Sequence, residues 1–104
     1  MAVAEVSIVP VGTASPSISA YVADCVKLLE SAGDVKYELN PMGTVLEGDL
    51  DRVLALIRLM HEHPFTKGVN RVVTTVRIDD RRDKTLTMSG KVAAVEKRLT
   101  GQNR

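Results

Sequence analysis

The sequence predicts an α+β domain of the split β-α-β type. Two observations carry this prediction: apolar residues alternate with polar ones in four short segments, and they recur every three or four positions in three longer segments. A period of two is typical of strands, and the longer period is typical of amphipathic helices. In chain order the segments read β-α-β-β-α-β-α, which is the split β-α-β unit followed by one added helix.

The first strand and the first helix are expected in the N-terminal third of the chain. Residues 3–11 predict the strand, with its apolar side chains toward the core. The helix is expected to begin at Ser15 and Pro16, which suit an N-cap and a first helical position. Gly33 is expected to end it. Its buried stripe comprises Ile18, Val22, Cys25, Leu29 and Ala32.

A hairpin and the second helix follow. Strands are expected over residues 35–40 and 44–47, on either side of a turn at 40–43. Asp49 is expected to cap the second helix, and Pro64 closes it. Its buried stripe is expected to comprise Leu50, Val53, Leu54, Ile57 and Met60.

The C-terminal third predicts one more strand and one more helix. The fourth strand is expected over residues 70–79, and after a charged loop the third helix is expected over residues 88–99. Its apolar stripe comprises Met88, Val92, Val95 and Leu99. The tail at residues 100–104 is expected to fray, and a single domain is expected to span residues 1–104.

The four strands are expected to form an antiparallel sheet in the order 4-1-3-2, because crossover connections are right-handed. This is the ferredoxin-like arrangement, with both main helices on one face of the sheet. The other face, called the open face below, has no helix of its own, so it must be solvated, bind a ligand or pack against another subunit. The residues expected on it are Glu5, Ser7, Glu38, Thr44, Leu46, Val73, Thr75 and Arg77.

Composition and charge exclude several classes of function. The 104 residues are 44% hydrophobic and 26% charged, which is typical of a soluble globular domain. The formal charge of +1 is too weak a field for nucleic-acid binding. No apolar run approaches the roughly 18 residues of a membrane span, and the N-terminus lacks the basic region of a signal peptide. Together with the single cysteine, these features predict a cytoplasmic protein with no membrane partner.

The sequence shows no recognisable catalytic or metal-binding constellation. It has no Ser/His/Asp order, no cysteine pair and no phosphate-binding fingerprint. Cys25 lies on the apolar stripe of the first helix, where a small thiol packs as a core residue. His61 and His63 are two positions apart, so on a helix their side chains point about 200° apart and cannot share one ion. We therefore predict no enzymatic activity, no cofactor and no metal.

Two polar segments admit two interpretations each. Residues 79–83, Asp-Asp-Arg-Arg-Asp, indicate a solvated loop with internal ion pairs, or else an anion site or interface clamp that uses the paired arginines. Residues 12–17 are rich in hydroxyls and precede a helix, so they either cap that helix or hold an anion. The sequence leaves these alternatives open.

Two classes of function remain at this point. The first is a small-molecule-binding protein, and the second is a structural or regulatory homo-oligomer with no ligand. Leu56 and Leu59 lie off the stripe of the second helix and add more apolar surface than one core requires. Self-association is expected for either class.

Several segments resemble a known family. The strand AEVSIVPVGT with SPSISAYVA after it, the hairpin YELNPMGTVLEGDLD and the strand TTVRIDDRRDK match that family in order and spacing over residues 4–97. The chain resembles the small single-domain proteins related to the YkoF-like thiamine-binding proteins. The resemblance implies a ferredoxin-like subunit that forms dimers and tetramers through its sheets and has no established catalytic activity. It also implies a ligand, either thiamine or its hydroxymethylpyrimidine part.

The resemblance further implies where the ligand binds. Family members bind it near the polar sheet face, with residues that fall here on Glu5 in the first strand and Thr44 in GTVLEG. From the same predicted face we add Ser7, Glu38 and Thr75 as candidate ligand-binding residues. Some two-domain relatives carry a basic residue in place of Glu5, so thiamine, its phosphates and the free pyrimidine all stay open as ligands.

Overall fold

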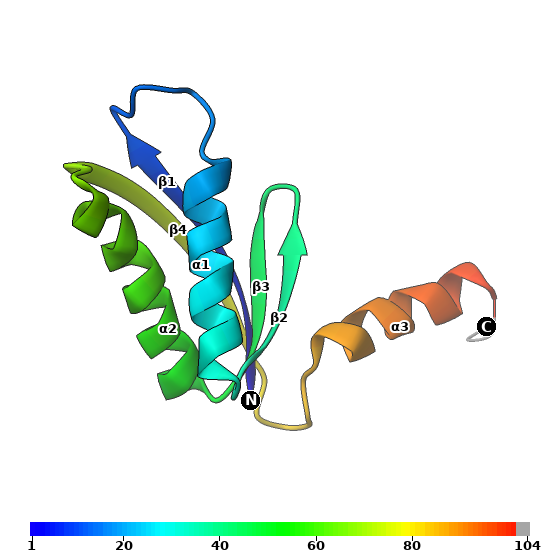
Figure 1. Cartoon of the computed structure of the whole chain (residues 1–104). Helices are drawn as coiled ribbons and strands as arrows, with labels where there is room; N and C mark the ends of the chain where they lie inside the picture. The colour runs from blue at the N-terminus through cyan, green and yellow to red at the C-terminus, as the bar shows by residue number, and fades with distance from the viewer. Residues whose placement is uncertain (102–104) are drawn as a thin grey trace.

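A four-stranded antiparallel sheet carries the fold, and two helices cover one of its faces (Figure 1). The computed structural model describes residues 1–101 of the chain. The strands are β1 (Ala2–Val11), β2 (Lys36–Asn40), β3 (Gly43–Gly48) and β4 (Arg71–Asp80). The helices are α1 (Ser19–Ala32), α2 (Leu50–Glu62), the short 3-10 helix η1 (His63–Lys67) and α3 (Met88–Leu99). The sheet order is β2-β3-β1-β4, so the predicted ferredoxin-like topology and the order 4-1-3-2 are confirmed.

Helix α1 begins later than the sequence predicted. Its first residue is Ser19, and no side chain caps it. The Ser15 hydroxyl instead accepts a hydrogen bond from the backbone N–H of Ser17 at 3.2 Å, so it stabilises the loop before the helix. The predicted end is confirmed, because Gly33 adopts the left-handed conformation (φ 71°) and its N–H bonds to the carbonyl of Leu29.

The buried face of α2 differs from the predicted stripe. Leu56 is 2% exposed, whereas Leu54, which was expected in the core, is 43% exposed. Successive helical residues are about 100° apart around the axis, so these two leucines flank the stripe at similar angles on its two sides. Only tertiary packing decides which of them is buried. Leu56 therefore belongs to the core of the subunit and not to a surface between subunits.

The core is aliphatic and lies between the two helices and the sheet. No aromatic side chain is among its buried residues, in keeping with an aromatic content of 3%. Cys25 is one of the core residues, as predicted. The buried cluster comprises Ala4, Val6, Ile8, Cys25, Leu29, Val35, Leu46, Val53, Leu56, Ile57 and Met60.

Helix α3 leaves the body of the molecule (Figure 1). Its bounds agree with the prediction, and the Thr87 hydroxyl caps it by accepting a hydrogen bond from the N–H of Gly90 at 2.9 Å. None of its residues is buried. Within residues 1–101, no helix combines the length and the apolar character that crossing a membrane requires. Of the tail that was expected to fray, residues 102–104 lie outside the described part of the chain.

Candidate functional site

Strand register places the predicted site residues on two different faces of the sheet. Residues directly opposite each other on neighbouring strands point to the same face. Thr44 lies opposite Val6, which is a core residue, and Thr44 itself is 5% exposed. Leu46 likewise lies opposite the buried Ala4. The prediction that Thr44 and Leu46 lie on the open face is therefore wrong, because both side chains point toward the helices.

The other four candidate residues share the open face, as predicted. Ser7 on β1 lies opposite Thr75 on β4. Glu5 on β1 and Glu38 on β2 both lie opposite Val45 on the strand between them. The register thus brings two carboxylates and two hydroxyls to one uncovered surface.

Glu5 already has a charged partner on the open face. Its Oε1 accepts a hydrogen bond from Nη2 of Arg77, on the neighbouring strand, at 2.8 Å. Both side chains of this pair are substantially exposed. An exposed ion pair is typically worth about 0–1 kcal/mol, so a ligand could take the place of Arg77 beside Glu5 at little cost.

A cavity lies on the face of the sheet that the helices cover, between α1 and the β2-β3 hairpin. Its volume is about 240 Å³. Residues 6–9 of β1 and residues 39–44 of the hairpin form two of its walls. Cys25 lines it from α1, Ile18 lines it from the position just before that helix, and Met60 lines it from α2. The core is therefore incompletely filled at this end.

The lining of this cavity is neutral and largely apolar. It contains no Asp, Glu, Lys, Arg or His. Thr44 contributes a hydroxyl from the face that the helices cover, and such a group can both donate and accept a hydrogen bond. A cavity of this composition suits an uncharged ligand, because a buried charge without a partner is costly.

The Cys25 thiol on the cavity wall is expected to be unreactive. It donates a long hydrogen bond to the carbonyl of Met60, with 3.7 Å between sulfur and oxygen. Burial, and to a smaller extent the neighbouring Asp24 carboxylate, raises the pKa of the Cys25 thiol to about 11. The reactive form of a cysteine is the thiolate, so this thiol lacks the character of a nucleophile.

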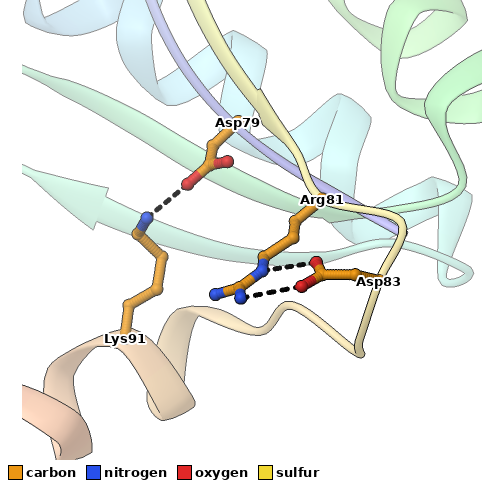
Figure 2. Close-up of polar contacts among 4 residues, drawn as sticks. All are labelled: Asp79, Arg81, Asp83 and Lys91. Carbon is orange, nitrogen blue, oxygen red and sulfur yellow. Dashed lines mark hydrogen bonds and ion pairs between the residues drawn. The ribbon is translucent and has the colours of Figure 1, made fainter.

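The charged loop after β4 satisfies its own charges. Arg81 binds Asp83 through two nitrogens (Figure 2), and Arg82 binds Asp80 in the same way. Hydrogen bonds from these arginines lower the pKa of both aspartates. Of the two interpretations of this segment, the geometry therefore favours the loop with internal ion pairs.

The two histidines have separate partners. Nδ1 of His61 is 2.7 Å from the Thr74 hydroxyl, and Nε2 of His63 is 3.1 Å from a carboxylate oxygen of Asp24. His61 lies on α2 and His63 is the first residue of η1. Within the described residues, no group of three or more His, Cys, Asp or Glu side chains could hold a metal ion.

Sequence reasoning missed the cavity, although one signal pointed to it. Leu39 and Met42 are apolar residues in and beside a tight turn, where polar residues are usual, and both are exposed. Both also line the cavity. Apolar side chains in such a turn indicate that the turn borders something other than water.

The fold and the cavity define a small α+β protein with a pocket at one end of its core. The chain belongs to the family of thiamine-binding proteins, whose family model matches residues 4–96. The UPF0045 protein YqgV of Bacillus subtilis is 52% identical over 102 residues, which cover 95% of this chain and 98% of that relative.

Solved structures share the fold. Protein MJ1052 of Methanocaldococcus jannaschii is 42% identical and superposes with a TM-score of 0.82, covering 91% of this chain and 95% of that one. A Thermotoga maritima protein named for thiamine biosynthesis or salvage superposes with a TM-score of 0.73, covering 90% of this chain and 97% of that one. Because this second protein is 19% identical, the likeness supports the fold alone.

Proposed function

We propose that this protein binds hydroxymethylpyrimidine, or thiamine through that part, in the cavity between α1 and the β2-β3 hairpin. It does so without catalysing a reaction. One observation carries the proposal: a chain of the thiamine-binding family has a neutral cavity with the Thr44 hydroxyl at its wall.

The volume of the cavity favours the pyrimidine part over the whole of thiamine. Sites for drug-sized ligands typically measure about 300–1,000 Å³, and one water molecule needs about 10–15 Å³. At about 240 Å³, the cavity lies just below the first range and far above the second. We therefore expect it to enclose one substituted ring, with the second ring of thiamine extending toward solvent.

Charge favours the same part of the ligand. The pyrimidine is uncharged, whereas the thiazolium of thiamine carries a fixed positive charge. No carboxylate lines the cavity to pair with that charge. Because an unpaired buried charge is costly, the thiazolium is expected outside the cavity.

Thr44 offers the pyrimidine a hydrogen bond, and the apolar walls of the cavity offer it contacts with the ring. The Thr44 hydroxyl can accept from the amino group or donate to a ring nitrogen. Ile18, Val22 and Met60 line the cavity and offer apolar contact to the faces of the ring. This combination of an apolar body with few polar groups is typical of small-molecule sites.

The open face is a second candidate site, and its carboxylates favour it. Glu5 and Glu38 lie on this face with the hydroxyls of Ser7 and Thr75. A carboxylate pairs with a cation, so this face suits the thiazolium of thiamine better than the free pyrimidine. The two sites therefore differ in the ligand they prefer.

Calorimetry with both ligands tests the proposal. Titrations of hydroxymethylpyrimidine and thiamine into the wild type should be repeated with Thr44→Val and with Thr75→Val. These two variants lose the same hydroxyl on opposite faces of the sheet, so each is the matched control of the other. We expect Thr44→Val to weaken binding of hydroxymethylpyrimidine by about 2- to 10-fold, the value of one neutral hydrogen bond, and Thr75→Val to leave it unchanged.

Two other outcomes would contradict parts of the proposal. If neither compound binds the wild type, the ligand assignment is wrong. If Thr75→Val and Glu5→Gln weaken thiamine binding while Thr44→Val does not, the ligand lies on the open face. Circular dichroism of each variant checks that its fold is unchanged.

Native mass spectrometry separates the proposal from its alternative of another class. The alternative is a structural or regulatory homo-oligomer with no ligand. The mass of the freshly purified protein would report the number of subunits, including the homotetramer that we propose, and any ligand that co-purifies. An oligomer that also stays bare after incubation with either compound would favour the alternative.

A further inference from the structure

Strand β1 is longer than its neighbour β3, so part of its edge has no strand beside it. β1 pairs with β4 along its whole length. Its pairing with β3 ends at Val6, opposite Thr44, because the hairpin turns back at residues 41–42. Toward that turn, β1 and the hairpin diverge (Figure 1). We call residues 7–11 of β1, on the side of β3, the free edge.

The main-chain groups of Ile8 point toward this free edge. In an antiparallel sheet, successive residues of a strand turn their N–H and C=O alternately to one neighbour and to the other. A Cβ on Gly43 would lie 3.0 Å from the carbonyl oxygen of Val6, so the main chain of Val6 faces β3. Two residues further on, the main chain of Ile8 faces the same side, where β3 offers no partner. Among residues 1–101, no backbone group of a turn or loop bonds to Ile8 either.

Pro10 supports this orientation independently. Proline has no backbone N–H, so within a sheet it is confined to positions where that group would face no partner strand. Pro10 lies in β1, is buried, and is opposite Val72 of β4. Because it is two residues from Ile8, its missing N–H belongs to the free edge and takes nothing from the pairing with β4. The sequence thus places a residue without a donor on the side of β1 that lacks a strand.

The free edge borders the cavity between α1 and the hairpin. Ser7, Ile8 and Val9 all line that cavity. The side chains of Ser7 and Val9 belong to the open face, so these two residues reach the cavity through their main chain. The Ile8 N–H and C=O are therefore a donor and an acceptor, side by side, at a wall that also carries the Thr44 hydroxyl.

We propose that the main chain of Ile8 binds the amino group and the adjacent ring nitrogen of the ligand, so that the pyrimidine continues the sheet where β3 ends. This inference rests on the proposed function and names the groups that select the ligand. The Ile8 C=O accepts from the amino group, and the Ile8 N–H donates to the ring nitrogen. The amides of Asn and Gln pair with adenine through the same pattern of donor and acceptor. The Thr44 hydroxyl is left for the second amino hydrogen or the other ring nitrogen.

Two proline substitutions test the free edge without any ligand. Ile8→Pro removes an N–H that has no partner, whereas Val9→Pro removes one that faces β4. We expect Ile8→Pro to lower the urea midpoint no more than Ile8→Ala does, since both lose the isoleucine side chain. Val9→Pro should lower it far more than Val9→Ala does, or prevent folding. If each proline is equally harmful relative to its alanine variant, Ile8 has a main-chain partner and the proposal is overturned.

Nuclear magnetic resonance of the wild type locates the contact with the ligand. In the free protein, the Ile8 amide hydrogen should exchange faster than those of Ser7 and Val9, which face β4. Saturating hydroxymethylpyrimidine should slow exchange of the Ile8 amide by about tenfold or more, the value of one hydrogen bond, and move its proton resonance downfield. The amides of Ser7 and Val9 should keep their exchange rates.

Calorimetry measures what each half of the contact contributes. Ile8→Pro should bind hydroxymethylpyrimidine about 5- to 100-fold more weakly than Ile8→Ala, because the ring nitrogen loses its donor in a buried site. The same ring without its amino group should bind the wild type more weakly by a similar factor, because it leaves the Ile8 carbonyl unpaired. The cavity thus selects rings in which an amino group lies beside an unprotonated nitrogen.

The results separate this inference from the proposed function. Suppose that hydroxymethylpyrimidine binds and Thr44→Val weakens it, but the Ile8 amide does not respond and Ile8→Pro binds as well as Ile8→Ala. The ligand then occupies the cavity without the main chain of Ile8, so the inference is wrong and the proposed function stands. If hydroxymethylpyrimidine does not bind the wild type, both fail together.

Discussion

Thr44 lies directly opposite Val6 across the β1-β3 pair, so its hydroxyl is on the face of the sheet that the helices cover. Glu5 precedes Val6 on β1 and therefore points to the open face. The two residues that the family resemblance links to one ligand thus lie on opposite sides of the sheet. This relationship turns one predicted site into two candidate sites with different chemistry, and it makes each separately testable.

Leu56→Ala and Leu59→Ala should have very different effects on stability. Leu56 is 2% exposed and Leu59 is 51% exposed, although both lie on α2. Truncating a buried leucine typically costs about 2–5 kcal/mol, because it loses apolar burial and leaves a cavity. Truncating the exposed leucine should change the free energy of unfolding by about 0.5 kcal/mol or less.

Urea denaturation of both variants at one protein concentration measures this difference. Similar losses from the two substitutions would mean that Leu59 is also buried, as it would be in a contact between subunits through α2. That result would support the original interpretation of Leu59 as part of a subunit interface.

The positions and order of the strands and helices could be predicted because each element has a clear period. Right-handed connections then leave one sheet order, and the structure has it. The face of Thr44 could not be predicted in this way. In the segment 44–47 the neighbours Val45 and Leu46 are both apolar, so the pattern permits either face. Only pairing with β1 decides between them.

The cavity and the surroundings of α3 could not be predicted from the sequence for a related reason. Cavity volume depends on how far α1 stands from the hairpin, which is a matter of tertiary packing. The stripe of α3 could be predicted, but a stripe does not tell which surface covers it. Leu56 shows the same limit. It and Leu54 flank the apolar stripe of α2 at similar angles, so helix geometry alone does not tell which of them is buried.

Glu47→Ala should loosen the start of α3 more than Glu47→Gln does. The carboxylate accepts a hydrogen bond from the N–H of Met88, at the positive end of the helix dipole. Alanine removes the acceptor and the charge, whereas glutamine keeps an acceptor oxygen at the same position. The loss of the charge alone is expected to cost about 0.3–1 kcal/mol.

Hydrogen exchange of the Met88 amide measures this local effect. We expect its protection to fall in the order wild type, Glu47→Gln, Glu47→Ala. Thr87→Ala serves as a second control, because it removes the cap of the same helix, a change that typically costs about 1 kcal/mol. Unchanged protection of the Met88 amide in Glu47→Ala would mean that Glu47 does not hold the start of α3 against the sheet.

The stability of the protein should fall between pH 9 and pH 11 because of Cys25. Burial raises the pKa of its thiol from the ordinary value of 9.0 to about 11. Below pH 9 the thiol is protonated in both the folded and the unfolded chain, so its contribution is complete. As the pH rises, the unfolded chain ionises first, and stability is lost until the folded pKa is passed.

The size of this loss is bounded by the shift of the pKa. Each pKa unit corresponds to about 1.4 kcal/mol, so the Cys25 contribution is at most about 3 kcal/mol. Unfolding curves of the wild type and Cys25→Ala across this range isolate the effect, since other groups titrate equally in both. Parallel decreases in the two proteins would show that Cys25 does not titrate as its burial implies.

The accessibility of Cys25 should report whether the cavity holds the ligand. The thiol lines the cavity but is 5% exposed, and its pKa of about 11 leaves little thiolate at neutral pH. Labelling of the native protein by a thiol reagent should therefore be slow compared with labelling of the denatured protein.

Hydroxymethylpyrimidine should slow the labelling of Cys25 further, because a ring in the cavity blocks the approach to the sulfur. Thr44→Val should reduce this protection at a fixed ligand concentration, and Thr75→Val, its matched control on the open face, should not. Protection that is absent although calorimetry detects binding would place the ligand away from Cys25 and would favour the open face with Glu5 over the cavity.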